Sequence, residues 1–195
     1  MDTSSQMDST PEIPVIAVEK RHKSADFSKA VRICHIELKT NSVQIAFEHV
    51  YGRADNALFA CTKALRRQGK VAVAKATEKT LSEIFDTFSS ELSDTLLNLE
   101  TSVKEKVPAQ MRAITYDRVR AFDAPSSNSF SSRLINLTVQ LDTLVSTVDI
   151  LELNNVLSPD EADQTAQSWI KRYRRFTNAI QLLRADTARS LKSTS

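Results

Sequence analysis

The sequence predicts a mainly α-helical fold with about four long helices and a minor β element. The 195 residues include only two glycines, Gly52 and Gly69, whereas sheet-rich and loop-rich chains need glycine for their turns. Four long segments also repeat apolar residues at spacings of three and four, which places those residues on one face of a helix. With 41% hydrophobic and 26% charged residues, the composition is that of a globular domain.

The N-terminal region differs in composition from the rest. Residues 1–29 are rich in Ser, Thr, Asp, Lys and Pro, so we expect a disordered or weakly ordered tail with a short apolar patch at residues 13–18. We expect residues 30–190 to form a single helical domain, and residues 191–195 to form a polar tail.

The first ordered element is expected at residues 31–40. As a strand, this segment places Cys34, Ile36 and Leu38 on one face, and as a helix it groups Cys34 and Leu38 with Val31. The β-branched residues and the short length favour the strand.

Residues 42–67 carry the first helical pattern, in which the apolar spacing runs through Gly52 without a break. This continuity favours one long helix. A turn at Gly52 is the alternative, because glycine is the residue at which a helix breaks most easily. Residues 71–106 show the clearest helical pattern, with a stripe of Leu, Ile, Phe and Val opposite acidic residues, and Pro108 follows it.

The second half of the chain begins with an ambiguous segment. Residues 111–122 fit either a second strand or a short helix, and residues 123–129, DAPSSNS, have the composition of a loop. Leucines then recur at helical spacing over residues 130–157. Ser158 and Glu161 form a capping box that starts a last helix, expected to fray near residue 190.

Several kinds of active site are excluded or unsupported. Two glycines are too few for the phosphate-binding loops GxxxxGK[ST] and GxGxxG. His22, His35 and His49 lack metal-ligand spacing, and Cys34 and Cys61 read as buried, reduced thiols of a cytoplasmic protein. No uninterrupted apolar run is long enough to span a membrane. We therefore predict no enzyme activity, no cofactor, no metal site and no membrane association.

Basic residues gather in separate blocks although the net charge is only +2. The segment WIKRYRRF, residues 169–176, places three aromatic residues on one helical face with Lys and Arg beside them. It fits a core stripe flanked by the stems of arginines, and it also fits an arginine patch for phosphates. The core stripe is the favoured interpretation, because such helices are common in globular proteins.

Residues 31–67 have the order of a ribbon-helix-helix unit, if the helix turns near Gly52. In that class of DNA-binding protein the strands of two chains pair, and the resulting ribbon enters the major groove. Burial of Cys34, Ile36 and Leu38 would leave Ile33, His35, Glu37 and Lys39 facing outward. Glu37 opposes binding to a polyanion.

Two stretches also resemble a known family. They are HIELKTNSVQIAFEHVYGR, from His35 to Arg53, and residues 119–169, which include an Asp-x-Leu sequence at Asp142–Leu144. Together they are similar to proteins of bacterial integrative and conjugative elements that are related to the AcaB-type transcriptional activators of conjugative plasmids. The resemblance implies a mobile-element protein that binds DNA through a ribbon at residues 32–39, with Gly52–Arg53 as its turn. Where the family has Ser-Pro, this chain has Ala124–Pro125.

The expected function is that of a non-enzymatic, DNA-associated regulator or accessory protein of a conjugative element. Expected partners are double-stranded DNA, a second copy of the chain in a homodimer, and other proteins of the element. The candidate DNA-binding residues are Arg32, His35, Lys39, Arg53, Arg66, Arg67, Arg172, Arg174 and Arg175. The alternative is a helical scaffold or adaptor that binds protein partners through its charged helix faces.

Overall fold

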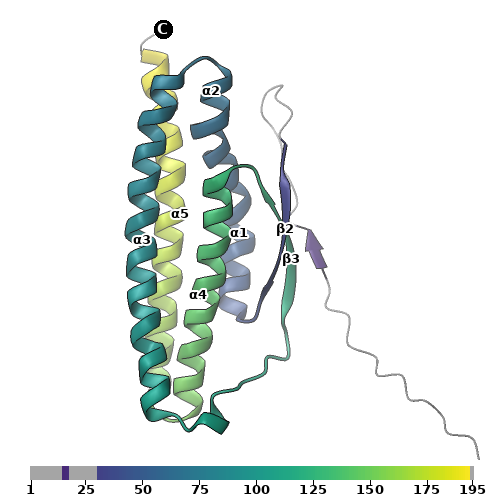
Figure 1. Ribbon diagram of the computed structural model, residues 1–195, viewed down its shortest axis with the longest axis vertical. Helices are drawn as coiled ribbons and strands as arrows, with labels where there is room; N and C mark the ends of the chain where they lie inside the picture. The colour runs from purple at the N-terminus through teal and green to yellow at the C-terminus, as the bar shows by residue number, and fades with distance from the viewer. Residues whose placement is uncertain (1–14, 18–29, 194–195) are drawn as a thin grey trace, which may run out of the picture.

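Four long helices stand side by side in a bundle, and a small sheet lies against one side of it (Figure 1). The computed structural model describes residues 15–17 and 30–193. Over these residues the predicted mainly α fold with a minor β element is confirmed. The elements are β1 (Val15–Ala17), β2 (Arg32–Leu38), α1 (Asn41–Phe59), a π-helix (Ala60–Ala64), α2 (Leu65–Arg67), α3 (Val71–Lys106), a 3-10 turn (Ala109–Met111), β3 (Arg120–Ser126), α4 (Ser129–Leu153) and α5 (Pro159–Ser193).

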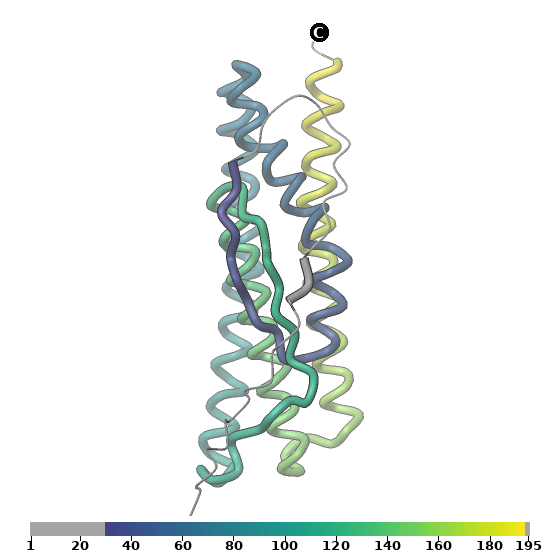
Figure 2. The backbone as a smooth tube through the Cα atoms, turned by 90° about the vertical axis from the view of Figure 1, so that its right-hand side faces the viewer, coloured from purple at the N-terminus to yellow at the C-terminus, as the bar shows by residue number. Residues whose placement is uncertain are grey.

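The sheet has the strand order β1-β3-β2, so its central strand comes last in sequence. β1 runs parallel to β3, and β2 pairs with β3 in antiparallel register from Arg32 opposite Ser126 to Leu38 opposite Arg120. Leu38, Phe122 and Ala124 point into the core and are fully buried. Figure 2 shows β2 and β3 crossing in front of the helices. The strand predicted at residues 31–40 is therefore confirmed.

The second strand begins only where the ambiguous segment ends. Most of residues 111–122 form neither a strand nor a helix, and the loop predicted at 123–129 is wrong for its first four residues, which belong to β3. Pro125 is compatible with the strand because β1 pairs only as far as Asp123, so no described strand needs an amide donor from Pro125 on that side. The Tyr51 hydroxyl donates a 2.8 Å hydrogen bond to the carbonyl of Pro125. Tertiary packing thus outweighs the turn-like composition.

The first helical segment is continuous, as its apolar spacing predicts. α1 runs on through the π-helix and α2 to Arg67, and Gly52 lies inside α1. The turn at Gly52–Arg53 that the family resemblance implies is therefore wrong. The chain turns at the other glycine, because Gly69 has a φ of +75°, a left-handed conformation that residues with a side chain rarely adopt.

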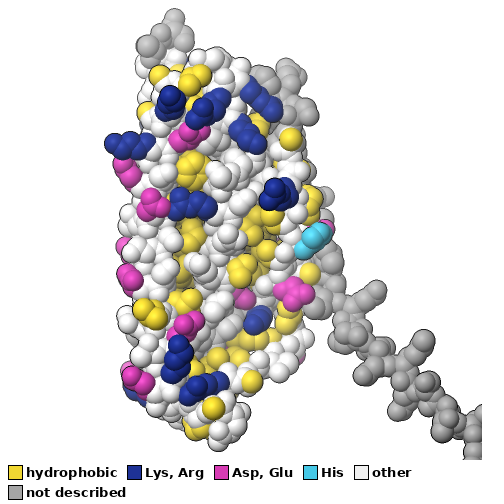
Figure 3. All heavy atoms as spheres, in the orientation of Figure 1, with side chains coloured by type: hydrophobic (Ala, Val, Ile, Leu, Met, Phe, Trp, Pro, Cys, Tyr) yellow, Lys and Arg dark blue, Asp and Glu magenta, His cyan; other side chains and the backbone are white. Residues whose placement is uncertain are grey.

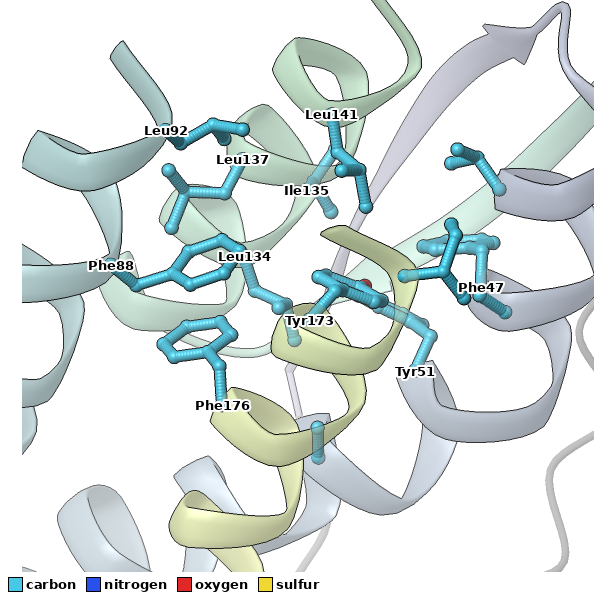
Figure 4. Packing of buried hydrophobic residues seen from close by; sticks show 14 of the residues in the cluster. Phe47, Tyr51, Phe88, Leu92, Leu134, Ile135, Leu137, Leu141, Tyr173 and Phe176 are labelled. Carbon is cyan, nitrogen blue, oxygen red and sulfur yellow. The ribbon is translucent and has the colours of Figure 1, made fainter. Parts of the chain in front are cut away.

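Aromatic side chains from α3 and α5 join in the centre of the bundle (Figure 4). The rings of Phe88 and Phe176 stack with their centroids 4.4 Å apart, and Phe85 meets Phe176 edge-on at 4.9 Å. Trp169 and Tyr173 are also buried, and the Tyr173 hydroxyl lies 2.8 Å from that of Thr138 on α4. The interpretation of the aromatic face of residues 169–176 as a core stripe is confirmed.

Two helix N-termini are fixed by carboxylates. The predicted capping box is confirmed: Ser158 donates its amide and hydroxyl to Glu161, whose own amide donates to the Ser158 hydroxyl. At the start of α1, Asp142 reaches across from α4 and accepts the amides of Lys39 and Thr40 at 2.8 and 2.9 Å. Asp142 thereby ties the β2–α1 junction to α4, which is a structural role for the Asp-x-Leu sequence.

Two elements lie partly or wholly outside the residues 30–190 expected to form the helical domain. α5 continues to Ser193, beyond the expected fraying point near residue 190. Within the expected N-terminal tail, residues 15–17 form β1, and the remaining residues of that tail lie outside those the structure describes. By length and composition α4 is apolar enough to cross a membrane, but 67% of its most apolar window is buried inside the fold.

Candidate nucleic-acid interface

The candidate DNA-binding residues lie in four separate places. Arg32 and His35 are on β2 and Lys39 follows it. Arg53 lies in the middle of α1, where its guanidinium donates to the carbonyl of His49. The remaining candidates are Arg66 and Arg67 in α2, and Arg172, Arg174 and Arg175 in α5.

The outward face of β2 has the predicted residues but little positive charge. Ile33, His35 and Glu37 are exposed, whereas the alternating residues turn toward the bundle. Opposite them on β3 stands Asp123, whose carboxylate contacts Nδ1 of His35. We call the surface formed by Ile33, His35, Glu37 and Asp123 the sheet face. It has two carboxylates and no Lys or Arg, so it repels phosphates more than it attracts them.

The arginines of α5 face an acidic neighbour. Arg172 lies 3.3 Å from Glu91 of α3, and its guanidinium stacks 4.9 Å from the ring centroid of Trp169. Arg175, Glu83 and Glu91 line a shallow, mostly apolar cleft of about 430 Å³ between the two helices. Carboxylates across the cleft therefore offset much of the charge of this second arginine patch.

A stronger concentration of positive charge lies at one end of the bundle, where α2, the start of α3 and the end of α5 meet (Figure 1). Residues 60–80 and 181–193 hold nine Lys and Arg against two acidic residues, whereas the other residues from 30 to 180 hold thirteen against seventeen. We call this surface the basic end. It consists of Lys63, Arg66, Arg67, Lys70, Lys75, Lys79, Arg184, Arg189 and Lys192.

Both acidic residues of the basic end are paired with arginines. Glu78 accepts two hydrogen bonds from Arg66, at 2.9 and 2.6 Å, and Asp186 lies 2.8 Å from Arg189. The unbalanced charge therefore belongs mainly to the lysines, and Figure 3 shows Lys and Arg side chains spread over this end of the molecule. A surface with this excess of positive charge suits the phosphate backbone of a nucleic acid, which is recognised by charge.

The sequence indicated only part of this surface. Arg66 and Arg67 are among the residues predicted from the sequence, but Lys70, Lys75 and Lys79 are isolated among apolar and small residues of a helix. Arg184, Arg189 and Lys192 follow more than 100 residues later. These residues can be found by counting the charges near each helix end, rather than by searching for consecutive basic residues.

The capacity of the described residues for catalysis can be judged from clusters that could hold a metal ion and from two titratable residues, Cys61 and Asp149. Among residues 30–193 no three His, Cys, Asp or Glu side chains gather where they could hold a metal ion. Burial raises the pKa of the Cys61 thiol to about 11, which makes it a weak nucleophile at neutral pH. Asp149 also has a raised pKa because of burial, and its carboxylate accepts a hydrogen bond from Tyr116 within the structure of the bundle.

Comparison with known proteins finds a solved structure with a similar fold. No family model matches the sequence, and no curated protein matches it. The solved structure of selenomethionine-containing AcaB from uropathogenic E. coli superimposes with a TM-score of 0.80 over 86% of each chain, at 20% sequence identity. The chain has an AcaB-like fold. This likeness supports the part of the family resemblance that concerns the fold, and the 20% identity leaves site residues to be argued from this chain alone.

Proposed function

We propose that this protein is a non-enzymatic, DNA-associated regulator or accessory protein of a bacterial integrative or conjugative element. The observation that supports it best is the basic end, where nine Lys and Arg face only two acidic residues. The AcaB-like fold supports the regulatory part of the proposal, since the sequence resemblance is to a family related to transcriptional activators.

In this proposal the basic end makes the main DNA contacts. Its lysines neutralise backbone phosphates and release condensed counterions, which gives affinity with little sequence information. Of the residues first considered, Arg66 and Arg67 belong to this surface. Arg32, His35 and Lys39 lie on or next to β2, and Arg53 lies on α1. Arg172 and Arg175 line the α3–α5 cleft, and Arg174 also lies on α5.

We place a homodimer contact at β2. This strand lies at one edge of the sheet, and no strand among the described residues pairs with its outer side. An unpaired edge is a template for another strand, and a second copy of β2 would extend the sheet across a two-fold axis. Ile33, an apolar side chain with 45% of its surface exposed, would lie at that contact.

The proposal is tested by fluorescence anisotropy with the full chain and duplex DNA from upstream of its gene, across a salt series. We expect saturable binding that is tighter than to a scrambled duplex and that weakens steeply as salt rises. Sedimentation of the same sample reports whether the free protein is a dimer. Absence of binding at low salt would contradict the proposal.

A scaffold or adaptor role is the second candidate, favoured by the cleft between α3 and α5. Its apolar floor includes Ile84, Phe88 and Phe176, and its rim carries charges of both signs, a combination common at sites for peptides. If DNA binding fails, this cleft is the first surface to examine for a protein partner.

A further inference from the structure

A second hollow, a cavity open to solvent, lies within the basic end and is bordered by the π-helix, α3 and the start of α4. Its volume is about 550 Å³, within the usual range of small-molecule sites. The residues that line it are Thr62, Lys63, Arg66, Glu78, Lys79, Ser82, Asn128, Ser129 and Phe130.

The cavity has a net positive charge. Arg66 and Glu78 neutralise each other through their two hydrogen bonds. Lys63 and Lys79 then remain, and neither makes an ion pair with a residue that the structure describes. Two ammonium groups, one from the π-helix and one from α3, balance the charge of one dianion.

The remaining wall supplies hydrogen-bond donors. Asn128 caps α4, accepting the amide of Ser131 at 2.9 Å while its Nδ2 donates to the Thr62 hydroxyl at 3.3 Å. This fixes the first turn of α4 against the π-helix. The amides of Ser129 and Phe130 precede the intrahelical ladder of α4, the Ser129 side chain lies at the same wall, and Ser82 lines the cavity from α3.

The π-helix is a third feature of this site. A π-helical turn is less favourable than an α-helical one and occurs often at functional sites. Here it covers Ala60–Ala64, and two of its residues, Thr62 and Lys63, line the cavity. No proline or glycine in the segment requires the irregularity.

We propose that this cavity binds a small molecule through a phosphate monoester group, with Lys63 and Lys79 as the charged contacts. The phosphate would lie between the two ammonium groups and the first turn of α4, because both offer donors to a dianion. The volume exceeds that of a bare phosphate, so the ligand has a body that extends toward Phe130. This ligand site shares Lys63, Arg66 and Lys79 with the basic end, but binding of a small phosphate ester there does not depend on DNA binding.

The test is calorimetric titration of the full chain with adenosine monophosphate and, separately, with inorganic phosphate at constant ionic strength. We expect saturable binding of the monophosphate that falls by at least about tenfold in the Lys63→Gln/Lys79→Gln variant, as loss of charge-assisted hydrogen bonds requires. Lys70→Gln/Lys75→Gln is the matched control, since it removes two lysines of the basic end outside the cavity and should leave binding unchanged.

Three other outcomes would overturn the proposal. If neither adenosine monophosphate nor inorganic phosphate binds saturably, the cavity is not a phosphate site. If both double variants lose affinity for the monophosphate equally, the protein attracts anions only through its overall charge. If Lys63→Gln/Lys79→Gln weakens DNA binding while neither small phosphate binds, the cavity takes a phosphate of the DNA backbone instead. Binding of adenosine monophosphate without any DNA binding would contradict the proposed regulator function and leave the ligand site standing.

Discussion

The sheet face and the basic end are built in opposite ways. The sheet face is local: alternation over seven residues of β2 decides which side chains point outward, and β3 adds one carboxylate. The basic end is assembled from two segments that lie more than 100 residues apart, and it exists only because the bundle brings them to one end. A local pattern therefore reveals the shape of a surface, whereas the charge of a surface depends on the tertiary fold.

Charge reversal at the basic end should lower DNA affinity far more than any substitution on the sheet face. Lys70→Glu, Lys75→Glu and Arg184→Glu together should weaken DNA binding roughly 100- to 1,000-fold at 0.1 M salt and flatten the logarithmic salt dependence by about three, since each phosphate contact contributes about 0.9 to that slope. Glutamate at the start of α3 suits the helix dipole, so folding should be retained. Anisotropy titrations measure both quantities.

The matched control is Lys104→Glu, Lys106→Glu and Arg118→Glu, at positions that lie in the last turn of α3 and in the segment before β3, outside the basic end. It changes the net charge equally, and we expect a much smaller loss of affinity. Equal losses in the two variants would mean that DNA senses only the total charge of the protein.

Reactivity of the two cysteines measures local opening in two places, because Cys34 lies on β2 and Cys61 lies in the π-helix of the basic end. Cys34 is half-buried on β2, whereas Cys61 is buried with its pKa raised to about 11 from an ordinary 9.0. Because only the thiolate reacts, we expect Cys61 in the folded protein to react with a thiol reagent at pH 8 at least about 100-fold more slowly than in the unfolded chain. Labelling followed by mass spectrometry measures this, with Cys34 expected to react first.

Raising the pH should increase Cys61 labelling up to its folded pKa. Because this thiol has a raised pKa, the neutral form is favoured in the folded state, and ionisation above about pH 9 destabilises the fold progressively until the pH passes about 11. A Cys61 that labels as fast as Cys34 at pH 8 would show that the interior beneath the basic end opens readily.

Removal of the Asp142 carboxylate should weaken the sheet side specifically. Asp142→Ala leaves the amides of Lys39 and Thr40 without their acceptor, which should lower the free energy of unfolding by about 2–4 kcal/mol. Asp142→Asn retains one acceptor oxygen and should cost less. Urea denaturation gives the free energies, and hydrogen exchange at Lys39 and Thr40 locates the change. Unaltered exchange there would contradict the tie between β2 and α4.

Substitutions on the sheet face should have the smallest effect on DNA. We expect His35→Ala and Glu37→Gln each to change DNA affinity less than about twofold, because neither removes a phosphate contact. The anisotropy assay used for the basic end applies here as well. If His35→Ala lowers DNA affinity more than tenfold, β2 and β3 make a DNA contact, and this strand pair contributes to recognition of the DNA sequence.

Elements determined by nearby residues could be predicted from the sequence, whereas an element determined by distant tertiary contacts could not. The long helix through Gly52, the strand around Cys34 and the Ser158–Glu161 capping box follow from periodicity and turn chemistry. β3 was misplaced because Pro125 and its serine neighbours favour loops, and only burial beneath Tyr51 and pairing with β2 make them a strand.

Only part of the basic end could be predicted from the sequence. Arg66 and Arg67 could be named from the sequence, but the lysines around them carry no sequence motif and acquire significance only from the two helix ends that meet there. The cavity between Lys63 and Lys79 was missed entirely, because no pattern in the sequence indicates that the helix around Thr62 would widen into a π-turn.

The order of the strands has a consequence for how the protein folds. β2 and its partner β3 are joined by α1 and α3, and His35 contacts Asp123 across 88 positions of sequence. Pairing at such separation closes a long loop, which is slow compared with helix formation. On the ribosome the inner edge of β2 therefore stays unpaired until α3 and β3 have emerged, and throughout that interval the nascent chain presents an open strand on which another strand can add.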